Sequence, residues 1–174
     1  MEPAVVTART IEGMKKEPTQ ARLERSAVHL LHRAGQCAGD IFAAEMSREG
    51  LTPRQYAVLV TVAQNEGVSQ TGLVERTGID RSTLADVVRR MLRKGLLQRR
   101  RTKEDARAYA VKLTEEGWRV LRSVEPSATR IDERLLSVLP AKQREQFLES
   151  LSMMITAFAS EASAAASATA REKL

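Results

Sequence analysis

Cysteine and aromatic residues are scarce in this chain of 174 residues. Cys37 is the only cysteine, and Phe, Trp and Tyr together make up 3% of the sequence. A single thiol excludes an internal disulfide framework and a zinc site built on cysteines. Ala, Leu, Val and Arg are abundant instead, and this composition favours helices over a packed sheet sandwich. The length is that of one domain with a real core.

Long apolar runs are also missing. No stretch of eighteen apolar residues is present, so we expect no transmembrane helix and no membrane partner. The first twenty residues lack an apolar segment followed by a small-residue cleavage site, so we expect no signal peptide. These absences predict a cytoplasmic protein.

Positive charge is concentrated in one part of the chain. The net charge is +6, but the segment from Arg81 to Lys112 has eleven basic and three acidic residues. That segment therefore carries +8, and the rest of the chain carries −2. A solvated charged face is the ordinary interpretation of a basic run. A patch this local instead favours a polyanionic partner, because neutralising phosphates releases condensed counterions.

The apolar spacing predicts a mostly helical chain with five regions. Residues 1–20 have no period and are expected to form a flexible arm, and residues 21–50 hold a first amphipathic helix over 21–46. Residues 51–117 hold several short elements that are described next, and residues 118–160 hold C-terminal helices broken at Pro140. The low-complexity tail, 161–174, is expected to be either a fraying helix or disordered.

The central region has the pattern of a helix-turn-helix followed by a hairpin. Ser69 is expected to cap one short helix, Gly78 to close it, and Asp80 to cap the next, which runs over 81–94. Apolar residues then alternate from Tyr109 to Leu113, which predicts a strand returning from a polar tip at 102–107. A helix of this kind fits the DNA major groove, and a hairpin tip can reach the neighbouring minor groove.

Residue types suit these positions. We predict base contacts for Arg81, Ser82, Thr83 and Arg90, although Ser82 and Thr83 also suit an ordinary first helical turn. Phosphate contacts are assigned to hydroxyl, amide and basic residues that precede or follow this helix: Ser69, Gln70, Thr71, Arg99, Arg100, Arg101 and Lys103. At the hairpin tip, Asp105 is either an exposed turn carboxylate or an acceptor that orients Arg107.

The segment 51–117 resembles the winged-helix core of MarR-type bacterial transcription regulators. The most specific match is D-x-R-x-x-x-V-x-L-T at the hairpin, with Arg-Ser-Thr at 81–83 as a second match. The resemblance extends over roughly residues 21–160. It implies a homodimer bound to a pseudo-palindromic operator, with Arg107 in the minor groove and Asp105 orienting it. Asp86 departs from the pattern, since many relatives have a basic or neutral residue there.

The flanking helices have apolar faces that a second copy of the chain would cover. The last helix presents Phe147, Leu151 and Phe158 on one side. Burial against a twofold mate is the economical arrangement, with packing inside one chain as the alternative. The fold class is therefore mostly α with a small β-wing: a winged helix-turn-helix core plus N- and C-terminal dimerisation helices.

The resemblance also implies release from DNA by a small effector, often phenolic or aromatic, bound between the DNA-binding lobe and the dimer helices. Candidate pocket residues are His29, His32, Arg33 and Trp118, although Trp118 suits the core equally well. The two histidines have no clustered Cys, Asp or Glu partner, so we expect neither a metal nor a cofactor. Redox sensing through Cys37 is an alternative, and a small packed thiol is the expectation.

Two other classes of function remain at this point. An enzyme would need a nucleophile–base constellation, a metal motif or a phosphate loop, and the sequence has none that we can nominate. A winged helix that binds protein instead of DNA would not require a charge of +8. The sequence therefore predicts a ligand-responsive transcription regulator, with a repressor as the expected type.

Overall fold

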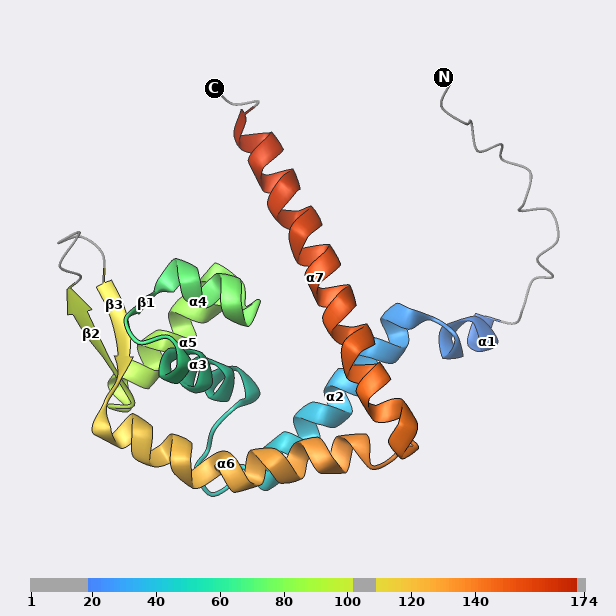
Figure 1. Ribbon diagram of the computed structural model, residues 1–174, viewed down its shortest axis with the longest axis horizontal. Coiled ribbons are helices and arrows are strands. Elements are labelled where there is room, and N and C mark those ends of the chain that lie inside the picture. Colours follow the sequence, from blue (N-terminus) through green and yellow to red (C-terminus); the bar gives the residue numbers. More distant parts are fainter. Residues whose placement is uncertain (1–18, 102–108, 172–174) are drawn as a thin grey trace.

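The computed structural model describes residues 19–101 and 109–171, which form seven helices and one three-stranded sheet (Figure 1). The helices are α1 (Thr19–Glu24), α2 (Ala27–Glu45), α3 (Pro53–Gln64), α4 (Gln70–Thr77), α5 (Arg81–Arg93), α6 (Glu115–Leu136) and α7 (Ala141–Arg171). The strands are β1 (Val68–Ser69), β2 (Leu97–Arg101) and β3 (Tyr109–Leu113). The mostly helical winged-helix fold predicted from the sequence is confirmed.

The prediction of one continuous helix over 21–46 is wrong at its N-terminal end. Ser26 adopts an extended conformation, and its side chain accepts a hydrogen bond from the His29 amide at 3.4 Å. Serine favours this capping role over a helix interior because its hydroxyl satisfies a free amide of the first turn. The chain therefore ends α1 at Glu24 and begins α2 at Ala27.

Most of the core lies within the lobe from α3 to β3, called here the winged-helix lobe, and it continues into α2 and α6 through Phe42, Val124 and Ile131. Its fully buried side chains include Val58 and Leu59 of α3, Leu73 of α4, and Val88 and Met91 of α5. The apolar stripe of α5 is formed by the buried Leu84, Val88 and Met91, while Val87 is half-buried.

The sheet has the order β1-β3-β2, and both pairings are antiparallel. Leu97 of β2 lies opposite Leu113 of β3, and Arg101 lies opposite Tyr109. This is the hairpin that the alternating residues predict. The two-residue strand β1 was not predicted, because its pairing with β3 has no periodicity that sequence could reveal. The hairpin tip over 102–107 lies outside the described residues.

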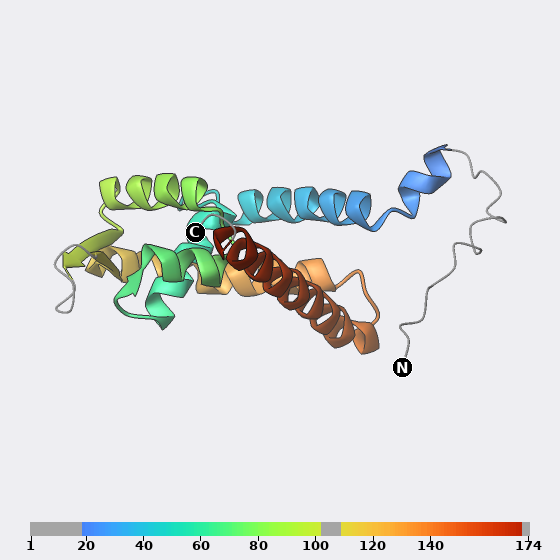
Figure 2. The ribbon, with the colours of Figure 1, turned by 90° about the horizontal axis from the view of Figure 1, so that it is seen from above.

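The flanking helices extend away from this lobe. α2 packs beside α6, and α7 leaves the end of α6 as a separate rod (Figures 1 and 2). α7 begins directly after Pro140, as predicted, and continues to Arg171 through most of the low-complexity tail. From Ala141 to Ser160 its side chains are exposed, apart from the half-buried Leu151.

Candidate nucleic-acid interface

Two short helices and a tight turn form the helix-turn-helix. The Ser69 hydroxyl accepts from the Gly72 amide at 3.1 Å and caps α4. Gly78 ends α4 in the left-handed conformation, with φ of 65°, which glycine adopts without the steric cost of a Cβ. The buried Ile79 follows and directs the chain into α5. The turn predicted between the two helices is confirmed.

Asp80 organises the first turn of α5. Its carboxylate accepts from the Thr83 amide at 2.9 Å and from the Ser82 hydroxyl at 2.7 Å. These hydrogen bonds, with Thr83 first, hold the pKa of Asp80 well below its usual range, so the cap is charged. Ser82 therefore uses its hydroxyl proton within the protein and presents only lone pairs outward. Arg81 is exposed beside it.

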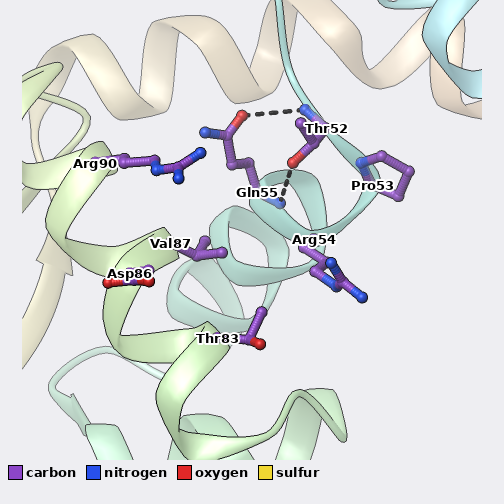
Figure 3. A pocket seen from close by; sticks show the side chains of 8 residues that line it. All are labelled: Thr52, Pro53, Arg54, Gln55, Thr83, Asp86, Val87 and Arg90. Carbon is purple, nitrogen blue, oxygen red and sulfur yellow. Dashed lines mark hydrogen bonds between the residues drawn. The ribbon is translucent and has the colours of Figure 1, made fainter.

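The structure brings several predicted DNA-contacting residues together around α5. Arg81 lines a small cleft with Gln70 and Thr71 of α4. Thr83 and Arg90 line a larger cavity, of about 470 Å³, with the start of α3 (Figure 3). One candidate base reader, Arg81, is thus next to two candidate phosphate contacts, and Thr83 and Arg90 share the larger cavity.

The larger cavity contains two polar residues that were missed in the sequence. Gln55 is only 6% exposed, and it completes a capping box: the Thr52 amide donates to Gln55 Oε1 at 3.0 Å, and the Gln55 amide donates to Thr52 Oγ1 at 3.3 Å (Figure 3). The neighbouring Arg54 adds a cation. The spacing of Thr52, Pro53 and Gln55 signals a capping box, and this signal could have found Gln55.

Asp86 lies on the same side of α5, and its charge is countered locally. Its carboxylate forms an ion pair with Arg89 at 2.5 Å, one turn further along the helix. Both side chains are more than half exposed, so the pair adds little stability. Its effect is to reduce the negative potential that Asp86 places beside Arg90.

The wing carries the remaining basic residues. Arg99 and Arg100 are exposed on β2. Arg101 belongs to the same strand, while Lys103, Asp105 and Arg107 lie outside the described residues. Lys112 of β3 forms an ion pair with Glu66, and its hydrogen bond lowers the pKa of that carboxyl. This pair joins the wing to the end of α3.

A second feature is a groove of about 330 Å³ between α2 and α6, called here the α2–α6 groove. Its lining is mainly apolar, with one carboxylate and one phenol: Gly35, Ala38, Gly39, Phe42, Pro53, Tyr56, Ala128, Ile131, Asp132 and Leu135. The Phe42 and Tyr56 rings meet at 5.8 Å between centroids and 53° between planes. Burial, then Asp132 and Glu125, raise the pKa of Tyr56.

The four predicted pocket residues do not line this groove in the single chain. His29, His32 and Arg33 lie in the N-terminal half of α2, and only His29 is half-buried. Trp118 is at the start of α6 and 40% exposed, so it is not a core residue. Their role in ligand binding stays a prediction. The glycines at positions 35 and 39, one helical turn apart, were the unused sequence signal for a hollow face.

Cys37 was expected to be packed, and that expectation is wrong for the single chain. Its thiol is exposed on α2. Among the described residues, no group of three or more His, Cys, Asp or Glu side chains is arranged to hold a metal ion. No helix in the described ranges combines the length and apolarity needed to cross a membrane.

The chain is similar in sequence and in fold to known proteins. A sequence model described as the MarR family matches residues 49–108. The transcriptional regulator HosA of Escherichia coli is 35% identical over 105 residues, which cover 60% of this chain and 78% of HosA. The PcaV transcriptional regulator of Streptomyces coelicolor, solved with its natural ligand, is 34% identical with a TM-score of 0.73, covering 78% of this chain and 95% of PcaV. Bordetella bronchiseptica BpsR, whose DNA binding is regulated by 6-hydroxynicotinic acid, is 27% identical with a TM-score of 0.72, covering 75% of this chain and 94% of BpsR.

Proposed function

Since the chain belongs to the MarR family of transcriptional regulators, we propose that it is a repressor that binds a pseudo-palindromic operator as a homodimer and leaves it when a small aromatic effector binds. The family consists of DNA-binding regulators and not of enzymes. The observation that carries the proposal is the first turn of α5, where Arg81 and Ser82 are exposed and Arg81 lies beside Gln70 and Thr71. This is the end of a recognition helix that meets base edges.

Charge and shape support the two-groove binding mode. α5 supplies Arg81 and Arg90 for the major groove, and β2 supplies Arg99 and Arg100 for the adjoining backbone. The family resemblance adds Arg107, oriented by Asp105, in the minor groove. In this arrangement the backbone contacts fix the position of the protein, and the contacts from α5 select the sequence.

The exposed apolar face of α7 supports a homodimer. Phe147, Ile155 and Phe158 are 43%, 69% and 60% exposed in the single chain. Leu30 and Leu31 of α2 are also exposed. A monomer rarely leaves so many large apolar groups in water, and a twofold mate that covers them would also set the spacing of two recognition helices.

The α2–α6 groove supports the effector role. It has room for a small ring, and its walls are mostly apolar. It lies between α2, which precedes the winged-helix lobe, and α6, which joins the lobe to α7. A ligand that changes the packing of α2 against α6 would change the separation of the two recognition helices. Repression follows if the operator overlaps a promoter, because the bound dimer then excludes polymerase.

A footprint on the promoters that flank its own gene, repeated at several salt concentrations, tests the proposal. We expect a symmetric protected site, and affinity that falls steeply with salt. Arg107→Ala should weaken binding strongly and leave the dimer folded; unchanged affinity in a gel shift would remove the wing from the mechanism. Binding to protein with no salt-dependent duplex binding would instead support a protein–protein role.

Redox sensing is a second candidate, favoured by the exposure of Cys37 on α2. An exposed thiol can meet an oxidant, whereas a buried one is inert. Cys37→Ser separates the two candidates. If peroxide releases the wild type and not the variant, redox sensing is correct. If peroxide releases neither protein and an aromatic effector releases both, the thiol is not the sensor.

A further inference from the structure

The α2–α6 groove has space that no side chain of the chain fills. Gly35 and Gly39 of α2 line it one helical turn apart. A Cβ built on either glycine would meet no atom within 4 Å. Glycine inside a helix destabilises the helix relative to alanine. Packing within the chain therefore does not require glycine at these two positions, and the space beside them is open.

The charged side chain on the wall of this groove is a carboxylate. Asp132 of α6 is part of the lining, and no lysine, arginine or histidine is among the lining residues in the described part of the chain. The nearby Arg130 and Arg134 are directed elsewhere, since both lie against Glu45, at 3.5 and 3.8 Å. Burial raises the pKa of Tyr56, and the charges of Asp132 and Glu125 raise it further.

The aromatic side chains of the groove add to this preference. Phe42 and Tyr56 form a tilted pair at the wall, and Phe42 is buried. The face of an aromatic ring attracts a cation, and the attraction grows when water is excluded. A carboxylate beside two aromatic rings is therefore a combination suited to a substituted ammonium group.

We propose that the α2–α6 groove binds a small organic cation, an amine whose aromatic or apolar body lies against Phe42 and whose ammonium group pairs with Asp132. This inference rests on the proposed effector role of the same groove. A carboxylate ligand would lose water and meet a like charge at Asp132, which is unfavourable. The groove would thus exclude acids such as 6-hydroxynicotinic acid, which regulates BpsR.

Three probes of matched shape and different charge test the proposal: benzylammonium, benzyl alcohol and benzoate. Their binding to the full chain is measured by titration calorimetry at one ionic strength. We expect benzylammonium to bind about tenfold more tightly than benzoate, because one probe gains and the other loses a charge interaction in a partly screened site, with benzyl alcohol between them.

Two variants assign the preference to the groove. Asp132→Asn keeps the size of the side chain and should reduce the preference for benzylammonium over benzoate to less than about twofold. Glu133→Gln, which removes the adjacent exposed carboxylate outside the lining, is the matched control and should keep the wild-type preference. Gly39→Leu should fill the groove and abolish binding of all three probes while DNA binding is retained.

The outcomes separate this inference from the proposed function. Tighter binding of benzoate, or an Asp132→Asn variant with an unchanged preference, would overturn the cation proposal and leave an effector groove in place. Binding of all three probes that survives Gly39→Leu would move the site elsewhere and overturn it as well. Absence of binding by all three probes, together with operator release by none of them, would reject both the effector groove and its charge preference.

Discussion

Gly117, in the first turn of α6, lies so close to Leu96 that a Cβ built on the glycine would stand 2.1 Å from the Leu96 carbonyl oxygen. The same carbonyl accepts from the Thr114 amide at 3.1 Å, and the Thr114 hydroxyl donates to the Gly95 carbonyl at 2.5 Å. The end of α5, the start of β2 and the start of α6 are therefore held together at one point. α6 carries Asp132 further along, so the base of the wing and the α2–α6 groove share one helix.

Gly117→Ala should destabilise the protein by about 2 kcal/mol, because the added methyl group meets backbone, which cannot rotate away as a side chain can. Urea unfolding measures the change. Gly35→Ala is the matched control: its added Cβ meets no atom within 4 Å, so it should be neutral or stabilise by about 0.5–1 kcal/mol. Equal stability of the two variants would show that the contact at Leu96 is relieved by a small shift.

Local signals in the sequence were sufficient for the winged-helix lobe. Ser69, Gly78 and Asp80 mark helix ends by their own chemistry, so the helix-turn-helix could be predicted from neighbours only a few residues apart. The strand β1 could not, because Val68 pairs with Val111, forty-three positions away. The break at Ser26 was missed because the apolar spacing continues across it.

The groove was harder to predict than the lobe, since its walls come from three separate helices. Asp132 follows Ile131 in a stripe that reads as ordinary core, and only the packing of α2 against α6 places it opposite Gly35 and Gly39. His29 and His32 were predicted to line the pocket because imidazole groups often bind ligands, but they do not line this groove. Residue type alone did not identify the groove, because the residues that line it are mostly apolar and have no reactive group.

Tyr56 should titrate above pH 10, the usual value for tyrosine, because burial and then Asp132 and Glu125 raise its pKa. Tyr109→Phe leaves Tyr56 as the only tyrosine, so ultraviolet absorbance of the phenolate follows it alone. Adding Asp132→Asn should lower this pKa, and Glu133→Gln should not change it. A pKa unaffected by Asp132→Asn would mean that the carboxylate does not act on the groove.

The same shift predicts how stability depends on pH. A folded pKa raised above the unfolded value means that the native state holds the phenolic proton more tightly. The stabilisation is therefore complete below pH 10 and is lost as the pH rises through the folded pKa of Tyr56. Tyr56→Phe should remove this part of the alkaline loss of stability, measured by urea unfolding at several pH values. An identical alkaline loss in the variant would contradict the assignment.

Phe158→Glu should convert the proposed dimer to a monomer, measured by light scattering at micromolar concentration. Phe158 is 60% exposed in the single chain, and an unpaired charge buried at an interface costs about 3–5 kcal/mol. Val138→Glu is the matched control, since Val138 is 82% exposed between α6 and α7 and outside the apolar face of α7. A wild-type monomer would contradict the proposed dimer, and a dimeric Phe158→Glu variant would place the interface elsewhere.

Arg81→Ala should weaken binding to the operator more than binding to unrelated duplex. A side chain that reads a base carries sequence information, and loss of one good base contact costs about 1–3 kcal/mol of discrimination. Gel shifts on operator and scrambled duplexes at the same salt concentration give the two affinities. If both affinities fall by the same factor, Arg81 contacts phosphate, and sequence selection comes from Thr83 or Arg90.

Arg100→Ala should have the opposite signature. Arg100 is exposed on β2, where the proposed binding mode gives it a phosphate and no base. Its loss should weaken operator and scrambled duplex by similar factors and reduce the slope of log affinity against log salt by about 0.9, the value for one released counterion. Arg122→Ala, which removes an exposed arginine from α6 away from the wing, should leave the slope unchanged. If Arg100→Ala left the slope at the wild-type value, β2 would lie off the DNA backbone. The wing would then contact DNA only through its tip. The net charge of +8 in the segment from Arg81 to Lys112 would then attract DNA mainly through the basic residues of α5.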